Sequence, residues 1–266
     1  MEQLVFQDAT DLRLASAVFV LPHPEKTAKG GEDWYFIADN KRAVGIADGV
    51  GGWADVGVDA GAYARQLMNG AREEAESDSV KQADVQLSAP SILQRAYERT
   101  TYQGSCTACV LVLNDAQLTA TNLGDSGYLI LRGAQVVYKS AQQQHDFNFP
   151  YQMGHPGSNS DTPSDAQLSE NTVQPGDIIV LGTDGLWDNC HEEEIIQVIT
   201  YYRTRKESPD KAAQAMAHYA RHRAADDKFP SPFALSAHAA GIRYMGGKMD
   251  DITVVVAYVQ QAASKL

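Results

Sequence analysis

The chain has 266 residues, of which 44% are hydrophobic and 21% charged, and this is the composition of an ordinary globular protein. Its formal net charge of -12 at pH 7 argues against a nucleic acid or an anionic membrane surface as partner, because both bind clustered Lys and Arg. Cations are the more natural ligands for such a chain.

The three cysteines, Cys106, Cys109 and Cys190, are too few for a secreted disulfide scaffold and predict a reducing, intracellular compartment. In an extended strand the first two would point to opposite faces, which favours core packing over a shared zinc ion. No apolar run approaches the roughly 20 residues of a membrane span. The opening residues, MEQLVFQDATD, lack the layout of a targeting peptide, so an organellar protein would have its presequence missing from this chain, and otherwise we expect a cytoplasmic one.

The first third of the chain changes from strand to helix periodicity. Apolar runs predict strands over residues 14–21, 34–38 and 43–47. A polar stretch over 73–86 precedes a second predicted helix, over 91–101. The first helix is indicated by apolar residues at helical spacing, namely Ala60, Tyr63, Ala64, Leu67, Met68 and Ala71.

The rest of the chain begins with a series of β signals separated by very short turns. Such turns join antiparallel neighbours, so we predict a meander over 106–113, 117–123, 127–132 and 135–140. Residues 154–172 are typical of a long surface loop. Further elements are expected as strands over 177–182 and 252–259 and helices over 192–202, 209–222 and 232–240. The economical interpretation is one α+β domain in which helices cover antiparallel sheets.

A few acids follow or precede buried-looking strands: Asp48, Asp125, Asp184 and the pair Asp250-Asp251. A buried carboxylate needs a hydrogen-bond donor, a basic partner or a metal ion, and Lys248 is the one basic residue close to them in sequence. Any one of these acids alone is more often a turn former or a helix cap. The set, with Glu32 and Asp33 added, favours a site for Mg²⁺ or Mn²⁺, which prefer oxygen ligands.

Several short blocks together carry a family resemblance: Glu32-Asp33, IADGVGGW, GSCTACV, LGDSG, GTDGLWDN and MDDITVVV. In this order and spacing they resemble the signature of the metal-dependent serine/threonine protein phosphatases, the protein phosphatase 2C family. LPHPEK, QQHDFNFPYQ and RYMGGKMDDITVVV resemble its organellar branch, of chloroplast or mitochondrion. The resemblance implies a four-layer αββα sandwich, two antiparallel β-sheets flanked by helices, in a single catalytic domain over 1–266 with its core at about 14–259.

The resemblance also implies roles for individual residues. Asp48 would bridge two Mg²⁺ or Mn²⁺ ions, and the backbone carbonyl of Gly49 would bind one of them. Asp184 and Asp250 would complete the other ion's protein ligands, which makes these two acids and Asp48 the catalytic residues. Glu32 and Asp33 would hold coordinated waters. Asp125 would bind a third and weaker ion, and Thr107 and Asp251 would line the surrounding water shell.

The implied reaction is attack on a phosphoserine or phosphothreonine phosphorus by a hydroxide held between the two ions. Two departures from the family pattern concern this step. Many members carry His directly after the Asp-Gly pair, where this chain has Val50, and an Arg that grips the phosphate, where it has Ala28. Lys29 or Lys26 could bind the phosphate, though without the bidentate fork of Arg. His145 is a candidate general acid, although a lone His in an aromatic-rich loop is more often packed structurally.

Two other functions remain open from the residues alone. One is a two-metal hydrolase of small phosphate esters, because the loops that would select a substrate have no readable code. The other is a non-catalytic binding module on the same fold, which would be expected to have lost the metal acids. The expected partner is a phosphorylated protein, with no nucleic acid and no transmembrane segment, and the chain is expected to be a monomer.

Overall fold

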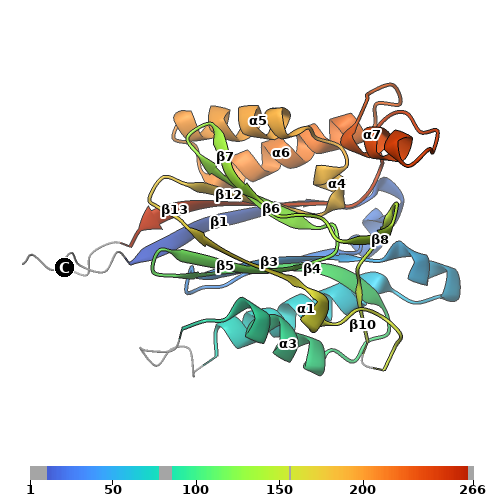
Figure 1. Cartoon of the computed structure of the whole chain (residues 1–266), viewed down its shortest axis with the longest axis horizontal. Coiled ribbons are helices and arrows are strands. Elements are labelled where there is room, and N and C mark those ends of the chain that lie inside the picture. Colours follow the sequence, from blue (N-terminus) through green and yellow to red (C-terminus); the bar gives the residue numbers. More distant parts are fainter. Residues whose placement is uncertain (1–10, 78–85, 156, 263–266) are drawn as a thin grey trace, which may run out of the picture.

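The computed structural model describes residues 11–77, 86–155 and 157–262. Two antiparallel sheets lie face to face in the middle of the molecule, and helices cover the outer face of each sheet (Figure 1). This confirms the α+β class and the four-layer αββα sandwich. In the described residues no helix is long and apolar enough to cross a membrane.

The first sheet joins the two ends of the described chain. Its strand order is β1 (Leu12–Leu21), β13 (Ile252–Gln261), β12 (Ile178–Gly182), β6 (Gly127–Arg132) and β7 (Gln135–Lys139). β1 pairs with β13 along its whole length, from Leu12 opposite Gln261 to Leu21 opposite Ile252. β12 is antiparallel to β13, with Gly182 opposite Val254, so the start of β13 and the end of β12 lie at the same end of this sheet.

The second sheet is built from the middle of the chain. Its order is β11 (Gln167–Thr172), β5 (Gln117–Leu123), β4 (Ser105–Asn114), β3 (Ala43–Gly49) and β2 (Asp33–Ile37), with β10 (Met153–Gly154) beside β4. A separate hairpin is formed by β8 (Gln144–Asp146) and β9 (Phe149–Pro150).

Two sequence predictions about these strands are wrong. The four runs from 106 to 140 do not form one meander, because β5 belongs to the second sheet and β6 to the first, so the turn at Gly124–Ser126 carries the chain between sheets. A short turn indicates reversal of direction, and it does not indicate which sheet the next strand joins. The predicted loop 154–172 also contains β11, an exposed edge strand whose polar sequence QLSENT gave no apolar signal.

The helices form the two outer layers. α1 (Ala60–Ala75) and α3 (Ala89–Arg99) lie on the second sheet, and α5 (Glu192–Thr204) and α6 (Pro209–Ala224) lie on the first (Figure 1). Residues 78–85 of the polar stretch lie outside the described residues. The shorter helical segments are η1 (Pro24–Lys29), η2 (Gly51–Val56), η3 (Pro163–Asp165), α4 (Asp184–Trp187) and α7 (Pro232–Ala239).

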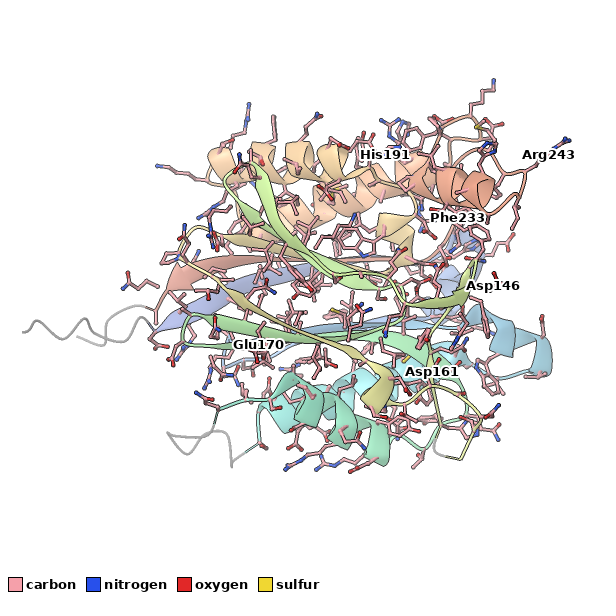
Figure 2. The ribbon with its side chains drawn as sticks, viewed as in Figure 1. Asp146, Asp161, Glu170, His191, Phe233 and Arg243 are labelled. Carbon is pink, nitrogen blue, oxygen red and sulfur yellow. The ribbon has the colours of Figure 1, made fainter. Side chains whose placement is uncertain are left out.

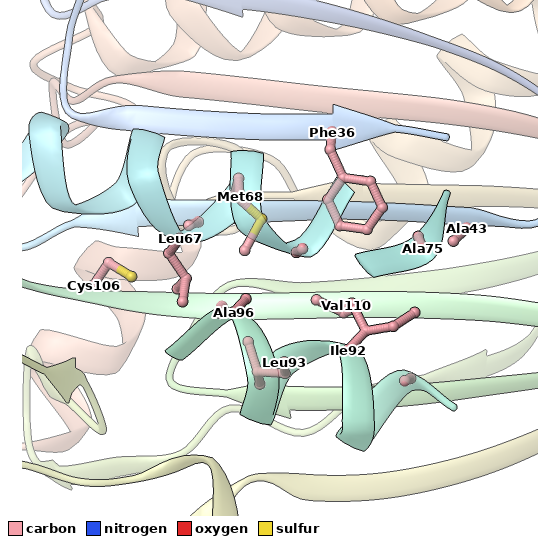
Figure 3. Close-up of a cluster of buried hydrophobic side chains, with 14 of the residues drawn as sticks. Phe36, Ala43, Leu67, Met68, Ala75, Ile92, Leu93, Ala96, Cys106 and Val110 are labelled. Carbon is pink, nitrogen blue, oxygen red and sulfur yellow. The ribbon is translucent and has the colours of Figure 1, made fainter. Parts of the chain in front are cut away.

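The strand alternation places apolar side chains in three cores. One core lies between the second sheet and its helices, where Leu67 and Met68 of α1 meet Val110 of β4 (Figure 3). A second lies between the first sheet and its helices, and a third lies between the two sheets. Cys106 belongs to the helix-side core and Cys109 to the core between the sheets, as predicted for opposite faces of one strand. All three cysteines are buried and free.

Candidate active site

The second sheet brings two of the predicted acids together through strand register. Asp33 at the start of β2 is the Cα partner of Asp48 near the end of β3, and Asp48 is in turn the partner of Thr107 on β4. Residues directly opposite one another on antiparallel strands have neighbouring side chains. Three residues widely separated in sequence therefore line one end of this sheet.

The first sheet supplies three further acids from its facing end. Asp184 follows β12 directly as the first residue of α4, and Asp250 and Asp251 immediately precede β13. The two sheets are joined here by hydrogen bonds to one buried carboxylate. The Oδ2 atom of Asp33 accepts from the hydroxyl of Thr183 at 2.8 Å and from the hydroxyl of Thr253 at 2.7 Å.

A cavity of about 200 Å³ lies where the two sheet ends meet. All three acids predicted to be catalytic line it: Asp48, Asp184 and Asp250. Glu32, Asp33 and Asp251 lie outside its lining. The full lining comprises Lys26, Asp48, Gly49, Val50, Gly51, Thr107, Asp125, Asn148, Pro150, Asp184, Lys248 and Asp250.

Asp251 fixes the chain segment that precedes Glu32 and Asp33. Its carboxylate accepts from the backbone N–H of His23 at 2.6 Å and from that of Glu32 at 2.9 Å. Gly31 precedes Glu32 with φ +82°, and a Cβ there would lie only 2.6 Å from Asp251 Oδ1. Left-handed backbone and this close approach both require glycine. Asp251 therefore orients the backbone at Glu32 instead of facing the cavity.

Gly49 also requires a bare backbone. A Cβ at this position would lie 2.8 Å from the carbonyl oxygen of Glu32 and 2.9 Å from backbone atoms of Ala60. The Gly49 N–H donates to the same Glu32 carbonyl at 3.1 Å. Glycine thus allows β3, the start of α1 and the segment before β2 to pack together beside Asp48.

Burial and crowding raise the pKa values of several carboxyl groups at the site. Burial, and then the neighbouring acids, raise the pKa of Asp33 and of Asp48 well above the usual range. The same causes raise the pKa of Asp125 to about 7 and that of Asp250 to about 6. A divalent cation would relieve this repulsion, because an opposite charge favours the ionised form of each acid.

Two lysines balance part of the negative charge. The ammonium of Lys248 lies 2.5 Å from Asp184 Oδ2 and 2.8 Å from Asp188 Oδ2. Burial alone would raise the pKa of Asp184, but the charge of Lys248 and its hydrogen bond lower it overall. Lys26 pairs with Glu32 and lies 3.6 Å from Asp251 Oδ2.

The donor chemistry of the cavity fits Mg²⁺ or Mn²⁺. Its acids offer only oxygen, as these hard cations prefer. Asp33 Oδ1 and Asp184 Oδ1 are buried and have no hydrogen-bond partner, which is costly for a carboxylate unless a cation completes it. In the described part of the chain, no three acid, His or Cys side chains already converge as in a closed metal site. Lys248 lies between Asp184 and Asp250, where such convergence would occur.

The remaining sequence candidates divide clearly by position. Lys26 lines the cavity, whereas Lys29 is exposed and lies outside the lining. His145 also lies outside: its ring stacks on Tyr151 at 3.9 Å between centroids, and its Nε2 atom lies 2.9 Å from Asp161 Oδ2. Figure 2 labels Asp161 on the segment that follows β10. His145 thus stacks on Tyr151 and contacts Asp161 outside the cavity lining.

Sequence reasoning missed several residues that shape the site. Thr183 and Thr253 are fully buried hydroxyls within otherwise apolar strand sequences, and this isolated polarity was the available signal. Asp188, whose pKa burial raises to about 7, had no comparable signal because it follows a helical turn. Asn148 lines the cavity from the β8–β9 hairpin, whose position only the folded chain reveals.

The fold is a two-sheet sandwich with an acid-lined cavity between the sheet ends, and comparison with known proteins gives the family. Residues 38–260 match the family model for stage II sporulation protein E (SpoIIE). Probable protein phosphatase 2C 80 of Arabidopsis thaliana is 49% identical over 93% of this chain and 59% of its own length. The chain therefore spans little more than half of that relative.

Two solved structures are also similar. The photosystem II phosphatase PBCP has a TM-score of 0.83 and 33% identity, covering 93% of this chain and 99% of that one. The catalytic domain of the serine threonine protein phosphatase PstP, in complex with 2 manganese ions, shares the fold at a TM-score of 0.63 and 16% identity, with 94% and 100% covered. This chain belongs to the protein phosphatase 2C family.

Proposed function

We propose that this chain is a protein phosphatase that removes phosphate from phosphoserine and phosphothreonine with the help of two Mg²⁺ or Mn²⁺ ions. The observation that carries the proposal is that Asp48, Asp184 and Asp250 line one cavity, with a buried Asp184 oxygen left without a partner. Its named relatives are protein phosphatases, and the fold neighbour PstP was solved with 2 manganese ions.

The proposed ligands are oxygens of the cavity and its wall. Asp48 and the Gly49 carbonyl would hold one ion, and Asp48, Asp184 and Asp250 would hold the other. When bound, two such ions lower the pKa of a water and stabilise the attacking and leaving oxygens of an in-line displacement. The supporting positions are Glu32 and Asp33 for coordinated waters, Asp125 for a third and weaker ion, and Thr107 and Asp251 for the surrounding shell.

A few further residues around the cavity orient these acids and the substrate. Thr183 and Thr253 fix Asp33, and Asp251 fixes the backbone at Glu32. Lys26 lines the cavity, and we assign it the binding of a phosphate oxygen as a single positive charge. Such a contact lacks the two-point geometry of an Arg.

Protonation of the leaving oxygen is assigned to solvent. Val50 lines the cavity at the position where many family members carry His, and none of the described lining residues is His. His145 faces a neighbouring cavity with Trp53 and Phe149. A His145→Ala variant that keeps its rate of phosphate release would support this assignment.

The deciding experiment measures phosphate release from phosphothreonine and phosphotyrosine peptides and from a small aryl phosphate, each with Mn²⁺, Mg²⁺ or a chelator. We expect turnover of the phosphothreonine peptide that requires a divalent ion. Activity unaffected by the chelator would refute the metal mechanism. Turnover of the aryl phosphate alone would favour a hydrolase of small esters, and no turnover with intact Mn²⁺ binding would favour a binding module.

We further propose that the protein is a monomer of an organelle, the chloroplast or the mitochondrion. The similarity to a photosystem II phosphatase supports the chloroplast. Imaging of the full-length gene product fused to a fluorescent protein tests the location, and light scattering of the purified chain tests the monomer. Diffuse cytoplasmic fluorescence would contradict the organellar location, and a dimeric mass would contradict the monomer.

A further inference from the structure

Lys248 is built into the acidic cavity and is not a surface lysine that happens to be near. Its side chain is only 18% exposed. The ammonium lies 2.5 Å from Asp184 Oδ2, 2.8 Å from Asp188 Oδ2 and 3.5 Å from Asp250 Oδ2. It also lies 5.1 Å from the ring centroid of Phe233, which Figure 2 labels on α7.

The backbone of Lys248 is fixed by a buried amide. Asn189 accepts from the Lys248 N–H at 2.8 Å and donates to the Lys248 carbonyl at 2.8 Å. The same Asn189 side chain donates to the carbonyl of Gly185 at 3.0 Å, next to Asp184. This amide therefore ties the loop before β13 to the turn that carries Asp184, and the lysine stem starts from a defined point.

The partners of Lys248 fall into two groups. Asp184 and Asp250 are ligands in the proposed metal centre, whereas Asp188 is not. A divalent ion bound by Asp184 and Asp250 would lie close to the ammonium, which contacts the Oδ2 atom of both acids, and close positive charges repel. Asp188 offers the ammonium a carboxylate to keep, so it need not be left buried and unpaired.

We propose that Lys248 is an internal counter-ion that competes with divalent cations for Asp184 and Asp250 and is retained by Asp188 when they bind. The inference rests on the proposed metal centre and concerns its affinity for ions. The ammonium neutralises the acids in the metal-free protein. It also makes the ion held by Asp184 and Asp250 bind more weakly than the same oxygens would bind it without the lysine.

The test compares Mn²⁺ binding by isothermal titration calorimetry in wild type, Lys248→Met and Lys248→Arg. We expect Lys248→Met to bind one Mn²⁺, the ion assigned to Asp184 and Asp250, at least about tenfold more tightly, and its metal-free form to unfold at lower temperature than wild type. Lys248→Arg keeps the charge and should retain weak binding. Lys211→Met is the control, because Lys211 is an exposed lysine paired with Glu207. Unchanged or weaker Mn²⁺ binding in Lys248→Met would overturn the proposal.

A second measurement uses the wild-type protein and does not depend on a variant that folds. Acetylation of each lysine is followed by mass spectrometry with and without saturating Mn²⁺. With Mn²⁺ bound, Lys248 would keep Asp188 but lose its contacts with Asp184 and Asp250. We therefore expect Lys248 to be acetylated faster with Mn²⁺ than without it, relative to Lys211. Equal rates would overturn the proposal even where Mn²⁺ binds. Absence of any Mn²⁺ binding would instead refute the metal centre itself, so the two failures are distinguishable.

Discussion

Asp33 and Asp48 are direct partners across the antiparallel β2–β3 pair. Asp33 is buried, with 1% of its surface exposed, and its Oδ2 atom is hydrogen-bonded to the other sheet. One carboxylate thus belongs to the second sheet by register and to the first by its hydrogen bonds. Its Oδ1 atom has no partner. The joint between the two sheets therefore lies beside the candidate metal centre, whose cavity Asp48 lines.

Asp184→Asn is expected to abolish phosphatase activity while the protein still folds. The substitution keeps the shape of the side chain but removes the negative charge that an ion and Lys248 share. Turnover of a phosphothreonine peptide with Mn²⁺, together with circular dichroism, checks both parts. The matched variant is His145→Ala, which should keep substantial turnover because His145 lies outside the cavity lining. The reverse pattern would overturn the assignment of roles.

Thr253→Val is expected to cost about 1–3 kcal/mol of unfolding free energy, because it leaves Asp33 Oδ2 with one hydrogen bond fewer in a buried setting. Urea denaturation measures the loss, and kcat should fall as Asp33 loses its orientation. Thr172→Val is the control, since that hydroxyl bonds to Gln117 on the exposed edge strand. Equal stabilities of the two variants would contradict the role given to Thr253.

Gly49→Ala is expected to destabilise the fold and to lower activity, because its Cβ would collide with backbone atoms of Glu32 and Ala60 at 2.8–2.9 Å. Backbone atoms cannot move aside as a flexible side chain can, so the predicted loss lies in the range of about 1–3 kcal/mol for overpacking. Gly52→Ala is the comparison, because nothing lies within 4 Å of a Cβ there. Thermal melting and peptide turnover of the pair decide between a steric role and a general effect of removing glycine.

The stability of the metal-free protein is expected to fall as pH rises from about 5 to 8. Burial raises the pKa of Asp250 to about 6 and those of Asp125 and Asp188 to about 7, above the unfolded value of about 3.9. The folded state therefore binds protons more tightly, and the stability that this supplies is lost as pH passes through the folded pKa values.

Chemical denaturation in a chelator at several pH values measures this slope. Added Mn²⁺ should stabilise the protein most at the high end of the range, because metal ligands must be deprotonated. Stability that rises between pH 5 and 8 in the chelator would contradict the raised pKa values of these acids.

Much of the fold could be predicted because its signals are local. The period of two in β4 placed Cys106 and Cys109 on opposite faces, and the structure confirms it. The helical spacing from Ala60 onward predicted α1, whose start is capped by Asp59. The edge strand β11 escaped detection because an exposed strand needs no apolar residues, and its partner β5 is supplied by tertiary packing.

The strands, most of the helices and the acids that end or begin buried strands could be predicted from the sequence, because periodicity and a polar residue beside an apolar run are local properties. The placement of β5 and β6 in different sheets, and the choice of acids that face the cavity, came from tertiary packing. It also decided that Lys248 meets Asp184, a residue 64 positions away. Such contacts depend on how two sheets pack, and no short stretch of sequence specifies that packing.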